Sequence, residues 1–487
     1  MYSSVTSCAL VGVEPRPVRI ETTVSRGRGN FIIVGLPDTA IRESRQRVRA
    51  AIRQSGFQFP GGNVVVNLSP ADLPKVGATY DLPIALGVLA AASDGRLSFD
   101  NFVSVGELSL QGRVRPVRAA LGAAVVARQE SKTCLLASDS VLAVSEGSAV
   151  GGIGCLRDAV AVAEGRKEPD GVSSPIPVGD TSADLADVRA QPAARRALEV
   201  AAAGAHNLLL VGPPGTGKTM LARRLPSILP PLDAQRQQEV ALVWAASGMD
   251  RTVSSSPPFR APHHSASMAA LIGGGAGIPT PGEVSKAHNG VLFLDELGEF
   301  PVSVLDALRQ PIEDGFVTVA RQAGSVRFPS SIQLVAATNP CPCGNLGSRR
   351  DACTCSDANR SRYTRRLSGP LLDRFDMRVD VPKLRATALG GPKGESSAVV
   401  ANRVRKAREA QSGRGALNGV LTGSALDELP IGEAAICALT DAAESAGLTA
   451  RGWDRVRRVA RTIADLDGSE PIREDHVTEA VSLRGTK

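Results

Sequence analysis

The sequence predicts an α/β protein whose middle part is built on a parallel sheet, with a mixed α/β region before it and helices after it. A glycine-rich loop between an apolar run and a helix start indicates the sheet, as does the alternation of short β-rich runs with helical stretches. Apolar residues recur at helical spacing after residue 398, which predicts the terminal helices. In parallel sheets of this kind, functional side chains lie where the strands end.

Two segments rich in glycine, proline and serine, residues 169–185 and 386–397, are expected to be linkers. They divide the 487 residues into three domains, which agrees with a usual size of about 150 residues per domain. The expected domains are residues 1–168, 186–385 and 398–487.

Local patterns predict the elements of each domain. In the first domain we expect a strand at 63–68, a buried helix at 82–92 and a hairpin at 102–115. The strands expected in the second domain are 207–211, 291–294 and 332–337, and the helices expected in the third are 398–411, 432–446 and 453–466.

The segment from Gly212 to Thr219 fits the pattern G-x-x-x-x-G-K-[ST], which binds nucleotide phosphates. Its glycines allow backbone N–H groups to close on phosphate oxygens at the start of a helix. The amine of Lys218 would reach the β- and γ-phosphates, and the hydroxyl of Thr219 would ligate Mg²⁺. The residues expected to bind ATP here are Gly212, Pro213, Pro214, Gly215, Thr216, Gly217, Lys218 and Thr219.

Two carboxylates follow the apolar strand at 291–294. Asp295 is expected to hold Mg²⁺ together with Thr219, and Glu296 to orient and deprotonate the water that attacks ATP. A strand that ends in two acids is a weak signal alone. It becomes a strong one beside the phosphate loop.

Two further side chains are candidates for catalysis. Asn339 ends the β-rich run at 334–339, where its amide could position the γ-phosphate or the water. Arg374 could reach the ATP of a neighbouring subunit as an arginine finger.

These motifs, in this order, resemble those of AAA+ ATPases of the magnesium chelatase-like family, the YifB/ComM type. The resemblance covers nearly the whole chain and is carried by residues 259–267, 282–296, 337–344 and 368–376. It implies a P-loop AAA+ core with a C-terminal helical lid, assembled as a hexameric ring with ATP between subunits. It also implies that Arg451, which matches the second sensor arginine of the lid, contacts ATP.

The resemblance implies two insertions in the ATPase core. Residues 273–282 leave room for a loop or hairpin within the second helix, and residues 316–328 alternate as a hairpin does. In related helicase rings such hairpins point into the pore and grip DNA. Arg321 or Arg327 could do so here, and a purely structural hairpin is the alternative.

The first domain resembles the proteolytic domain of Lon. Thr79 lies where Lon carries its nucleophilic serine, but there is no lysine near Leu121, where the general base belongs. A hydroxyl without a base to accept its proton is a poor nucleophile. We therefore expect a catalytically degenerate domain that serves assembly or binding.

Four cysteines lie directly after Asn339 with the spacing C-x-C…C-x-C, and four thiolates could close a structural zinc site. Free thiols or a redox role are the alternatives. The cysteines are Cys341, Cys343, Cys353 and Cys355. For the adjacent pair His263 and His264, hydrogen bonding at a helix start or a contact between subunits is expected rather than metal binding.

The net charge is +7, and nine arginines lie between Arg16 and Arg53. Together with the basic runs 349–374 and 451–461, they favour a polyanionic partner, DNA first, over solvated helix faces. Aromatic residues make up only 3%, which argues against a platform for base stacking. No apolar run predicts a membrane span or a signal peptide, so we expect a cytoplasmic location.

The leading functional expectation is a DNA-dependent ATPase, a helicase or branch-migration motor of recombination or of DNA uptake in competence. A chaperone-like ATPase that remodels proteins is the first alternative. A motor subunit of a metal chelatase is disfavoured by the extra N-terminal domain, and a peptidase by the missing lysine.

Overall fold

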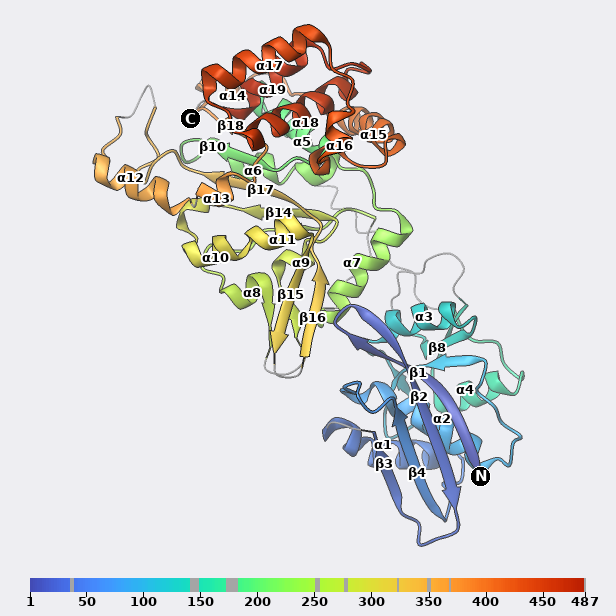
Figure 1. Ribbon diagram of the computed structural model, residues 1–487. Coiled ribbons are helices and arrows are strands. Elements are labelled where there is room, and N and C mark those ends of the chain that lie inside the picture. Colours follow the sequence, from blue (N-terminus) through green and yellow to red (C-terminus); the bar gives the residue numbers. More distant parts are fainter. Residues whose placement is uncertain are drawn as a thin grey trace.

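The computed structural model describes residues 1–35, 39–140, 149–171, 183–249, 255–275, 279–321, 324–347, 352–367 and 369–485. Most of the expected linker at 169–185 lies outside these residues. Figure 1 shows a domain that contains the N-terminus, a central sheet with its helices, and a cluster of helices near the C-terminus. Within the described residues, no helix combines the length and the hydropathy that a membrane crossing requires.

A seven-stranded sheet forms the N-terminal domain, in the order β3-β4-β2-β1-β5-β8-β9. The pairs β1–β2 and β2–β4 are antiparallel, whereas β5, β8 and β9 continue from β1 in parallel. A mixed sheet of this kind confirms the mixed α/β prediction. The strands are β1 (Tyr2–Val11), β2 (Glu14–Ser25), β3 (Phe31–Val34), β4 (Asn63–Ser69), β5 (Phe102–Ser104), β8 (Thr133–Ala137) and β9 (Val150–Ile153).

Helices cover this sheet. The predicted buried helix is α2, which has apolar residues on all sides and is buried over almost its whole length. The predicted hairpin is confirmed only in its second half, because β5 joins the large sheet as a parallel strand and the short strands β6 and β7 alone pair antiparallel. These elements are α1 (Thr39–Gln54), α2 (Asp81–Ala92), α3 (Ala120–Gln129), α4 (Leu156–Ala163), β6 (Glu107–Leu108) and β7 (Val114–Arg115).

The central sheet has five parallel strands in the order β11-β14-β17-β10-β18. Strands β14, β17 and β10 are the three predicted from their apolar runs, and they are buried almost throughout because helices lie on both faces. The strands are β10 (Leu208–Val211), β11 (Phe259–Arg260), β14 (Gly290–Leu294), β17 (Ile332–Thr338) and β18 (Met377–Asp380). The parallel core of the predicted fold is confirmed.

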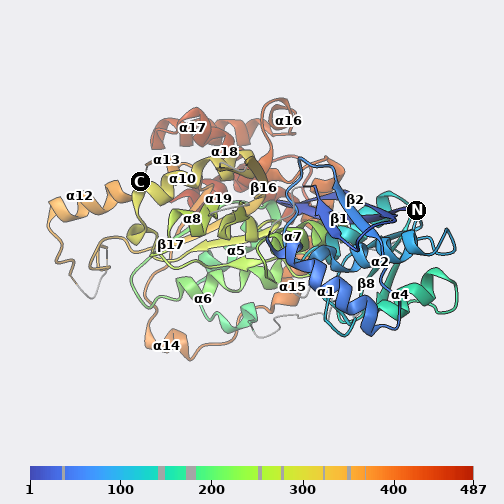
Figure 2. The ribbon, with the colours of Figure 1, turned by 90° about the horizontal axis from the view of Figure 1, so that it is seen from below.

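Short helices connect these strands. The helices of this region are α5 (Pro192–Gly204), α6 (Lys218–Ala222), α7 (Ala234–Ala246), α8 (Met268–Ile272), α9 (Glu283–Lys286), α10 (Val302–Ala307), α11 (Arg309–Asp314), α12 (Asp357–Arg366) and α13 (Gly369–Leu372). In Figures 1 and 2, α12 extends away from the rest of the molecule.

Both regions expected to hold insertions form antiparallel pairs. In the first, β12 (Gly273–Gly274) pairs with β13 (Thr280–Pro281) between helices α8 and α9. In the second, β15 (Phe316–Arg321) pairs with β16 (Gly324–Pro329), as the alternation predicted. The β15–β16 hairpin projects from the central sheet toward the N-terminal domain (Figure 1).

The C-terminal helices pack on the central sheet rather than standing apart. Residues from β10, α5 and α18 lie in a single hydrophobic core, among them Leu210, Val200 and Val459. The predicted helices correspond to α15, α17 and α18. The helices are α14 (Ala386–Leu389), α15 (Ser397–Gly413), α16 (Ser424–Asp427), α17 (Glu433–Ala446), α18 (Ala450–Leu466) and α19 (Glu474–Arg484).

Among the described residues, the N-terminal domain contacts the central domain through helix α3 and through the turn between β1 and β2. Helix α3 shares a hydrophobic cluster with Ala241 and Leu242 of α7. The turn between β1 and β2 meets the β15–β16 hairpin, because Val13 packs in the same cluster as Val326 and a Cβ on Gly12 would lie 2.3 Å from Val326 Cγ1. Strand β16 of the second insertion therefore lies against the N-terminal domain.

Candidate functional site

The phosphate loop connects β10 to α6, in the strand–loop–helix order that the motif predicts. Gly215 and Gly217 have φ values of +74° and +91°, which side chains other than glycine rarely tolerate. At Gly212 a Cβ would lie 2.2 Å from the carbonyl oxygen of Val381. Glycine is therefore required at these positions for shape as well as for phosphate access.

Lys218 lies at the centre of the loop. Its amine donates hydrogen bonds to the carbonyl oxygens of Gly212 and Pro213 at 2.6 and 2.9 Å, and to Oδ1 of Asn339 at 3.1 Å. Burial lowers the pKa of Lys218, while the nearby charges of Asp295 and Glu296 oppose that shift. The amine is thus held in place between the loop and the end of β17.

Thr219, the residue after Lys218, contacts Asp295. The Thr219 hydroxyl donates to Asp295 Oδ2 at 2.7 Å, and Asp295 Oδ1 accepts the backbone N–H of Glu296 at 3.0 Å. A hydroxyl and a carboxylate are oxygen ligands of the kind that Mg²⁺ prefers. The two residues therefore fit the expected magnesium site, and the structure brings them together with Lys218 and Asn339.

Glu296 begins the turn after β14 with φ of +52°, a left-handed backbone conformation that is uncommon outside glycine. Its carboxylate is half exposed, and its Oε2 lies 3.3 Å from Nδ1 of His264. The histidine is a neighbour that the sequence patterns did not connect with Glu296.

The two arginines expected at the nucleotide occupy other surroundings. Arg374, in the loop before β18, is largely buried and forms an ion pair with Glu313 of α11. Arg451 is exposed in the first turn of α18. Arg374 was expected to act on the ATP of a neighbouring subunit, and its ion pair with Glu313 was not foreseen. Arg451 was expected to contact ATP, and that expectation stays a prediction.

The two candidate DNA contacts, Arg321 and Arg327, lie on the two strands of the β15–β16 hairpin. Arg327 is exposed on β16, and its guanidinium lies 3.5 Å from the centre of the Phe316 ring. Val317, Val319 and Phe328 are buried. One face of the hairpin thus packs inward while Arg327 remains accessible, and the side chain of Arg321, at the hairpin tip, lies outside the described residues.

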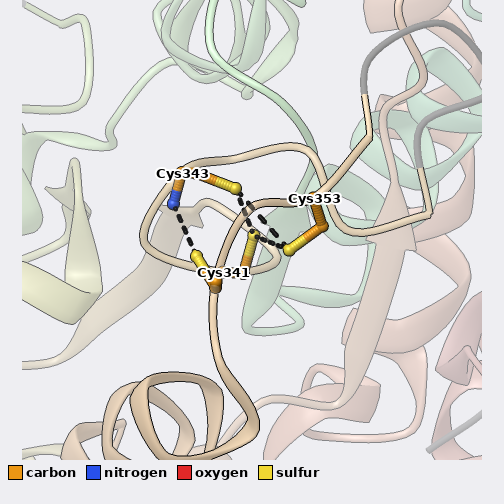
Figure 3. A group of neighbouring side chains, drawn as sticks. Cys341, Cys343 and Cys353 are labelled. Atoms are coloured by element: carbon orange, nitrogen blue, oxygen red, sulfur yellow. Dashed lines mark hydrogen bonds between the residues drawn. The ribbon is translucent and has the colours of Figure 1, made fainter.

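The four cysteines after β17 gather at one point, as their spacing suggested. Their sulfur atoms all lie within 4.8 Å of one another. Those of Cys341, Cys343 and Cys353 are directed toward each other, at separations of 3.4 to 3.6 Å (Figure 3). Tetrahedral zinc with Zn–S bonds of about 2.3 Å places sulfurs about 3.8 Å apart, so this group fits the metal.

Backbone groups support the cysteine cluster. The N–H of Cys343 donates to Cys355 Sγ at 3.4 Å, and that of Leu346 donates to Cys341 Sγ at 3.3 Å. Hydrogen bonds from backbone N–H groups lower the pKa of Cys343 to about 5. A Cβ on Gly344 would lie 2.4 Å from Pro214 Cδ, so the loop that carries the cysteines presses directly on the phosphate loop.

Some arginines of the basic runs form ion pairs with buried carboxylates. Arg47 pairs with the buried Asp81 at 2.7 Å, and Arg461 pairs with the buried Asp465 at 2.8 Å. Arg455 is buried as well. The basic run at 451–461 is therefore largely structural, because its helix is amphipathic and turns several of these arginines inward.

Thr79 lies in a 3₁₀ turn, η1 (Ala78–Tyr80), at the start of α2. Lys75, four residues earlier, is buried, and its amine donates to the carbonyl oxygen of Pro70. Burial lowers the pKa of Lys75. The position near Leu121 falls in the apolar helix α3, which supplies no base.

Comparison with known protein families gives matches to three parts of the chain. Residues 184–389 match the family described as magnesium chelatase, subunit ChlI; residues 20–140 match subunit ChlI of Mg-chelatase; and residues 394–484 match the C-terminal part of ChlI.

Two relatives align over almost their full length. The chain is 42% identical over 494 residues to the uncharacterised protein YifB of Escherichia coli, covering 98% of this chain and 96% of YifB. It is 41% identical over 496 residues to the competence protein ComM of Haemophilus influenzae, with the same coverage. A shorter match, 31% over 139 residues, is to Lon protease 2 of Bacillus subtilis, covering 26% of this chain and 25% of that protein.

Proposed function

Because this chain belongs to the magnesium chelatase-like AAA+ family that contains YifB and ComM, we propose that it hydrolyses ATP and uses the energy to move along or remodel DNA. The observation that carries the ATPase proposal is the connected group of Lys218, Asn339, Thr219 and Asp295 at the ends of three neighbouring strands. This group unites a cation for phosphates, an amide and two oxygen ligands for Mg²⁺.

The residues of this group have distinct roles in the proposed reaction. The Lys218 amine binds the β- and γ-phosphate oxygens, and Thr219 and Asp295 hold Mg²⁺, which offsets the negative charge on the phosphates. Glu296 accepts a proton from the water that attacks the γ-phosphorus, while the bond from that phosphorus to the β–γ bridging oxygen breaks. Asn339, already hydrogen-bonded to Lys218, orients the water or the γ-phosphate.

The ring proposal rests on Arg374. An arginine finger acts on the ATP of a neighbouring subunit, so the site is complete only in an oligomer, and a hexamer is the assembly we propose. Within the single chain, the ion pair with Glu313 neutralises the guanidinium charge of Arg374. We propose that Arg451 contacts nucleotide once subunits assemble.

DNA as the partner is supported by three features. Arg327 is an exposed cation on a projecting hairpin. Helix α12 carries exposed arginines on a segment that extends from the core (Figure 1). The relative from Haemophilus influenzae is named a competence protein, which favours a role in DNA uptake or recombination.

The four-cysteine cluster is proposed to hold a structural zinc ion. The sulfur separations fit tetrahedral thiolate coordination, and backbone N–H groups donate to two of the sulfurs. Zinc bound there would fix the loop between Asn339 and α12. Through the contact of Gly344 with Pro214, it would also fix one wall of the phosphate loop.

Steady-state ATP hydrolysis tests this function. The assay is run without addition, with single-stranded, duplex and branched DNA, and with an unfolded protein, and Glu296→Gln serves as the blank. We expect DNA to stimulate hydrolysis, and the stimulation to weaken as salt rises, because phosphate contacts release counterions. Stimulation by unfolded protein alone would replace DNA with protein as the partner, and no hydrolysis above the blank would contradict the ATPase itself.

A further inference from the structure

One side of helix α1 carries arginines that face away from the interior of the N-terminal domain. Arg45, Arg49 and Arg53 are spaced four residues apart, so they lie on one side of the helix, about 6 Å apart along its axis. Arg45 and Arg53 are exposed, and Arg49 is half-buried. Arg47 points the other way, because it pairs with the buried Asp81. The helix therefore separates one structural arginine from a row of three at the surface.

This row of arginines lies against the start of strand β3. Arg45 donates a hydrogen bond to the carbonyl oxygen of Phe31, the first residue of β3, at 3.4 Å. The guanidinium of Arg49 lies 4.9 Å from the centre of the Phe59 ring, and that ring centre lies 5.3 Å from the centre of the Phe31 ring. The arginine side of α1 is thus continuous with the edge of the sheet.

The loop between β2 and β3 adds two exposed cations to the same part of the domain. Arg26 and Arg28 lie in this loop, the second of them only three residues before Phe31. Strand β3 is the outermost strand of its sheet, and α1 packs beside it (Figure 1). We call this surface the basic edge, and it consists of Arg26, Arg28, Arg45, Arg49 and Arg53.

The basic edge has few acidic neighbours. Helix α1 contains a single acidic residue, Glu43, which lies six residues before Arg49 and is therefore rotated about 120° from it around the helix. Within the described residues, the arginines of the basic edge other than Arg45 form no ion pair, whereas the exposed Arg166 of the same domain pairs with Glu164. Positive charge at this surface is thus left for a partner to neutralise.

The basic edge also lies apart from the contacts that join the two domains. In the described part of the chain, helix α3 and the turn between β1 and β2 make those contacts. Neither element carries an arginine of the basic edge. The surface is therefore open in the single chain and separate from the hairpin that carries Arg327.

The phosphates of a DNA backbone match the chemistry of this surface. A guanidinium presents a planar fork of N–H donors that binds a phosphate through two hydrogen bonds. Phe59 is half-buried beneath the guanidinium of Arg49, so it does not offer a free ring on which an unpaired base could stack. Duplex DNA, which presents closely spaced phosphates and keeps its bases paired, therefore fits the basic edge better than a single strand does.

We propose that the basic edge is a second DNA-binding surface, which holds duplex DNA by its phosphates while the β15–β16 hairpin acts elsewhere on the DNA. The inference rests on the proposed DNA-dependent function and adds to it a site in the N-terminal domain. A second site on the same chain raises the effective concentration of DNA at the hairpin. It captures DNA without being required for the stimulated rate itself.

The test removes charges from the basic edge in pairs. One variant is Arg49→Gln/Arg53→Gln on α1, and the other is Arg26→Gln/Arg28→Gln in the loop before β3. The loop pair changes two exposed side chains outside any helix or strand, so it tests the proposal even where the loss of the Arg49–Phe59 contact weakens α1.

A charge-matched control removes two exposed arginines elsewhere in the N-terminal domain, Arg96→Gln/Arg166→Gln. For each full-length protein we measure the Kd for fluorescent duplex and single-stranded oligonucleotides at several salt concentrations. ATP hydrolysis is then measured as a function of duplex concentration, which gives the maximal rate and the concentration for half-maximal stimulation separately.

We expect each basic-edge pair to raise the Kd for duplex about tenfold at about 0.1 M salt. The slope of log K against log salt should become shallower by about two, because each arginine accounts for about one phosphate contact. The duplex concentration for half-maximal stimulation rises with the Kd. The maximal rate and the rate without DNA stay at the wild-type values, in contrast to the loss of stimulation expected for Arg327→Ala.

Duplex Kd values and salt slopes equal to those of the control would overturn the inference and leave the hairpin as the DNA contact. A loss of affinity confined to the single strand, or a lower maximal rate at unchanged Kd, would overturn it as well. Wild-type protein that binds neither oligonucleotide would remove DNA from the proposed function and this inference with it, while the ATPase proposal is tested by hydrolysis without DNA.

Discussion

The amine of Lys218 donates a 3.1 Å hydrogen bond to the side chain of Asn339, 121 residues away in the chain. The first residue follows β10 and the second follows β17, and these strands are neighbours in the sheet. The bond links the group that would bind phosphate with the group that would sense it. It also places the cysteine loop, which starts two residues after Asn339, beside the proposed nucleotide site.

Lys218→Ala is expected to lower kcat/KM for ATP by roughly 10²-fold or more, because the phosphates lose their buried cation. Lys406→Ala, at an exposed position of α15, is the matched control and should leave the rate unchanged. ATP turnover under steady-state conditions measures both. Comparable turnover in Lys218→Ala and the control would remove Lys218 from the mechanism.

Arg374→Ala is expected to reduce kcat by about 10³-fold while nucleotide binding persists, since an arginine finger acts on the transition state of a neighbour. Mixing this variant with Lys218→Ala should restore part of the activity, because each subunit supplies what the other lacks. Activity that rises after mixing supports a shared site. A preparation that stays monomeric at all concentrations yet loses no activity in Arg374→Ala would exclude it.

Arg327→Ala should abolish the stimulation of hydrolysis by DNA and leave basal hydrolysis intact, because the side chain is exposed on the hairpin and forms none of the contacts among Lys218, Asn339, Thr219 and Asp295. Arg321→Ala is expected to act in the same way. Arg405→Ala, an exposed arginine on α15, is the control. Equal losses of basal and stimulated rates in Arg327→Ala would assign the residue to the fold rather than to DNA.

Purified protein is expected to contain about one zinc ion per chain, as tetrahedral coordination by four thiolates requires. The double variant Cys343→Ser/Cys353→Ser should lose the metal, unfold at lower temperature and hydrolyse ATP more slowly, because the loop against Pro214 is no longer held. Cys437→Ser, at an exposed cysteine, is the control. Elemental analysis of protein purified without chelators measures the zinc content per chain. Metal-free wild-type protein would contradict the zinc site.

Arg47→Met is expected to destabilise the protein by roughly 3 kcal/mol, because Asp81 would remain as a buried carboxylate without its partner. Burial raises the pKa of Asp81, and the hydrogen bonds from Arg47 and Ser44 only partly oppose it. Because the pKa of Asp81 is higher in the folded protein than in the unfolded chain, ionisation of Asp81 lowers the free energy of unfolding as the pH rises. The destabilisation caused by Arg47→Met is therefore expected to grow with pH.

Urea unfolding at two pH values measures this effect. Arg53→Met, on the exposed side of the same helix, should change stability by less than about 0.5 kcal/mol. A similar small change for Arg47→Met would show that the pair contributes nothing net to the fold.

Local sequence patterns predicted the elements whose apolar residues recur with the spacing that their burial imposes. The buried strands of the central sheet read as continuous apolar runs, and the β15–β16 hairpin as an alternation, because burial on two faces or on one imposes those patterns. The hairpin expected at 102–115 was partly wrong, because a local pattern does not show which strand is the partner, and only long-range pairing assigns β5 to the large sheet.

Runs of charged residues were the sequence feature that predicted surface positions least well. Arg461 and Arg47 look like surface cations in the sequence but form pairs with buried carboxylates. Asp465 lies four residues from Arg461, so that ion pair could be predicted from neighbouring charges in the sequence. Asp81 lies 34 residues from Arg47, so their ion pair could not.

The sequence by itself determined the candidate nucleotide site, because a phosphate-loop motif requires glycines and a lysine at fixed spacing and the acids must follow a strand. Tertiary structure alone decided which side chains face that site from other elements. The pairs His264–Glu296 and Arg374–Glu313, and the contact of Gly344 with Pro214, join segments that no local pattern connects. Such contacts depend on how strands are ordered and loops close in space, and a linear spacing carries no record of either.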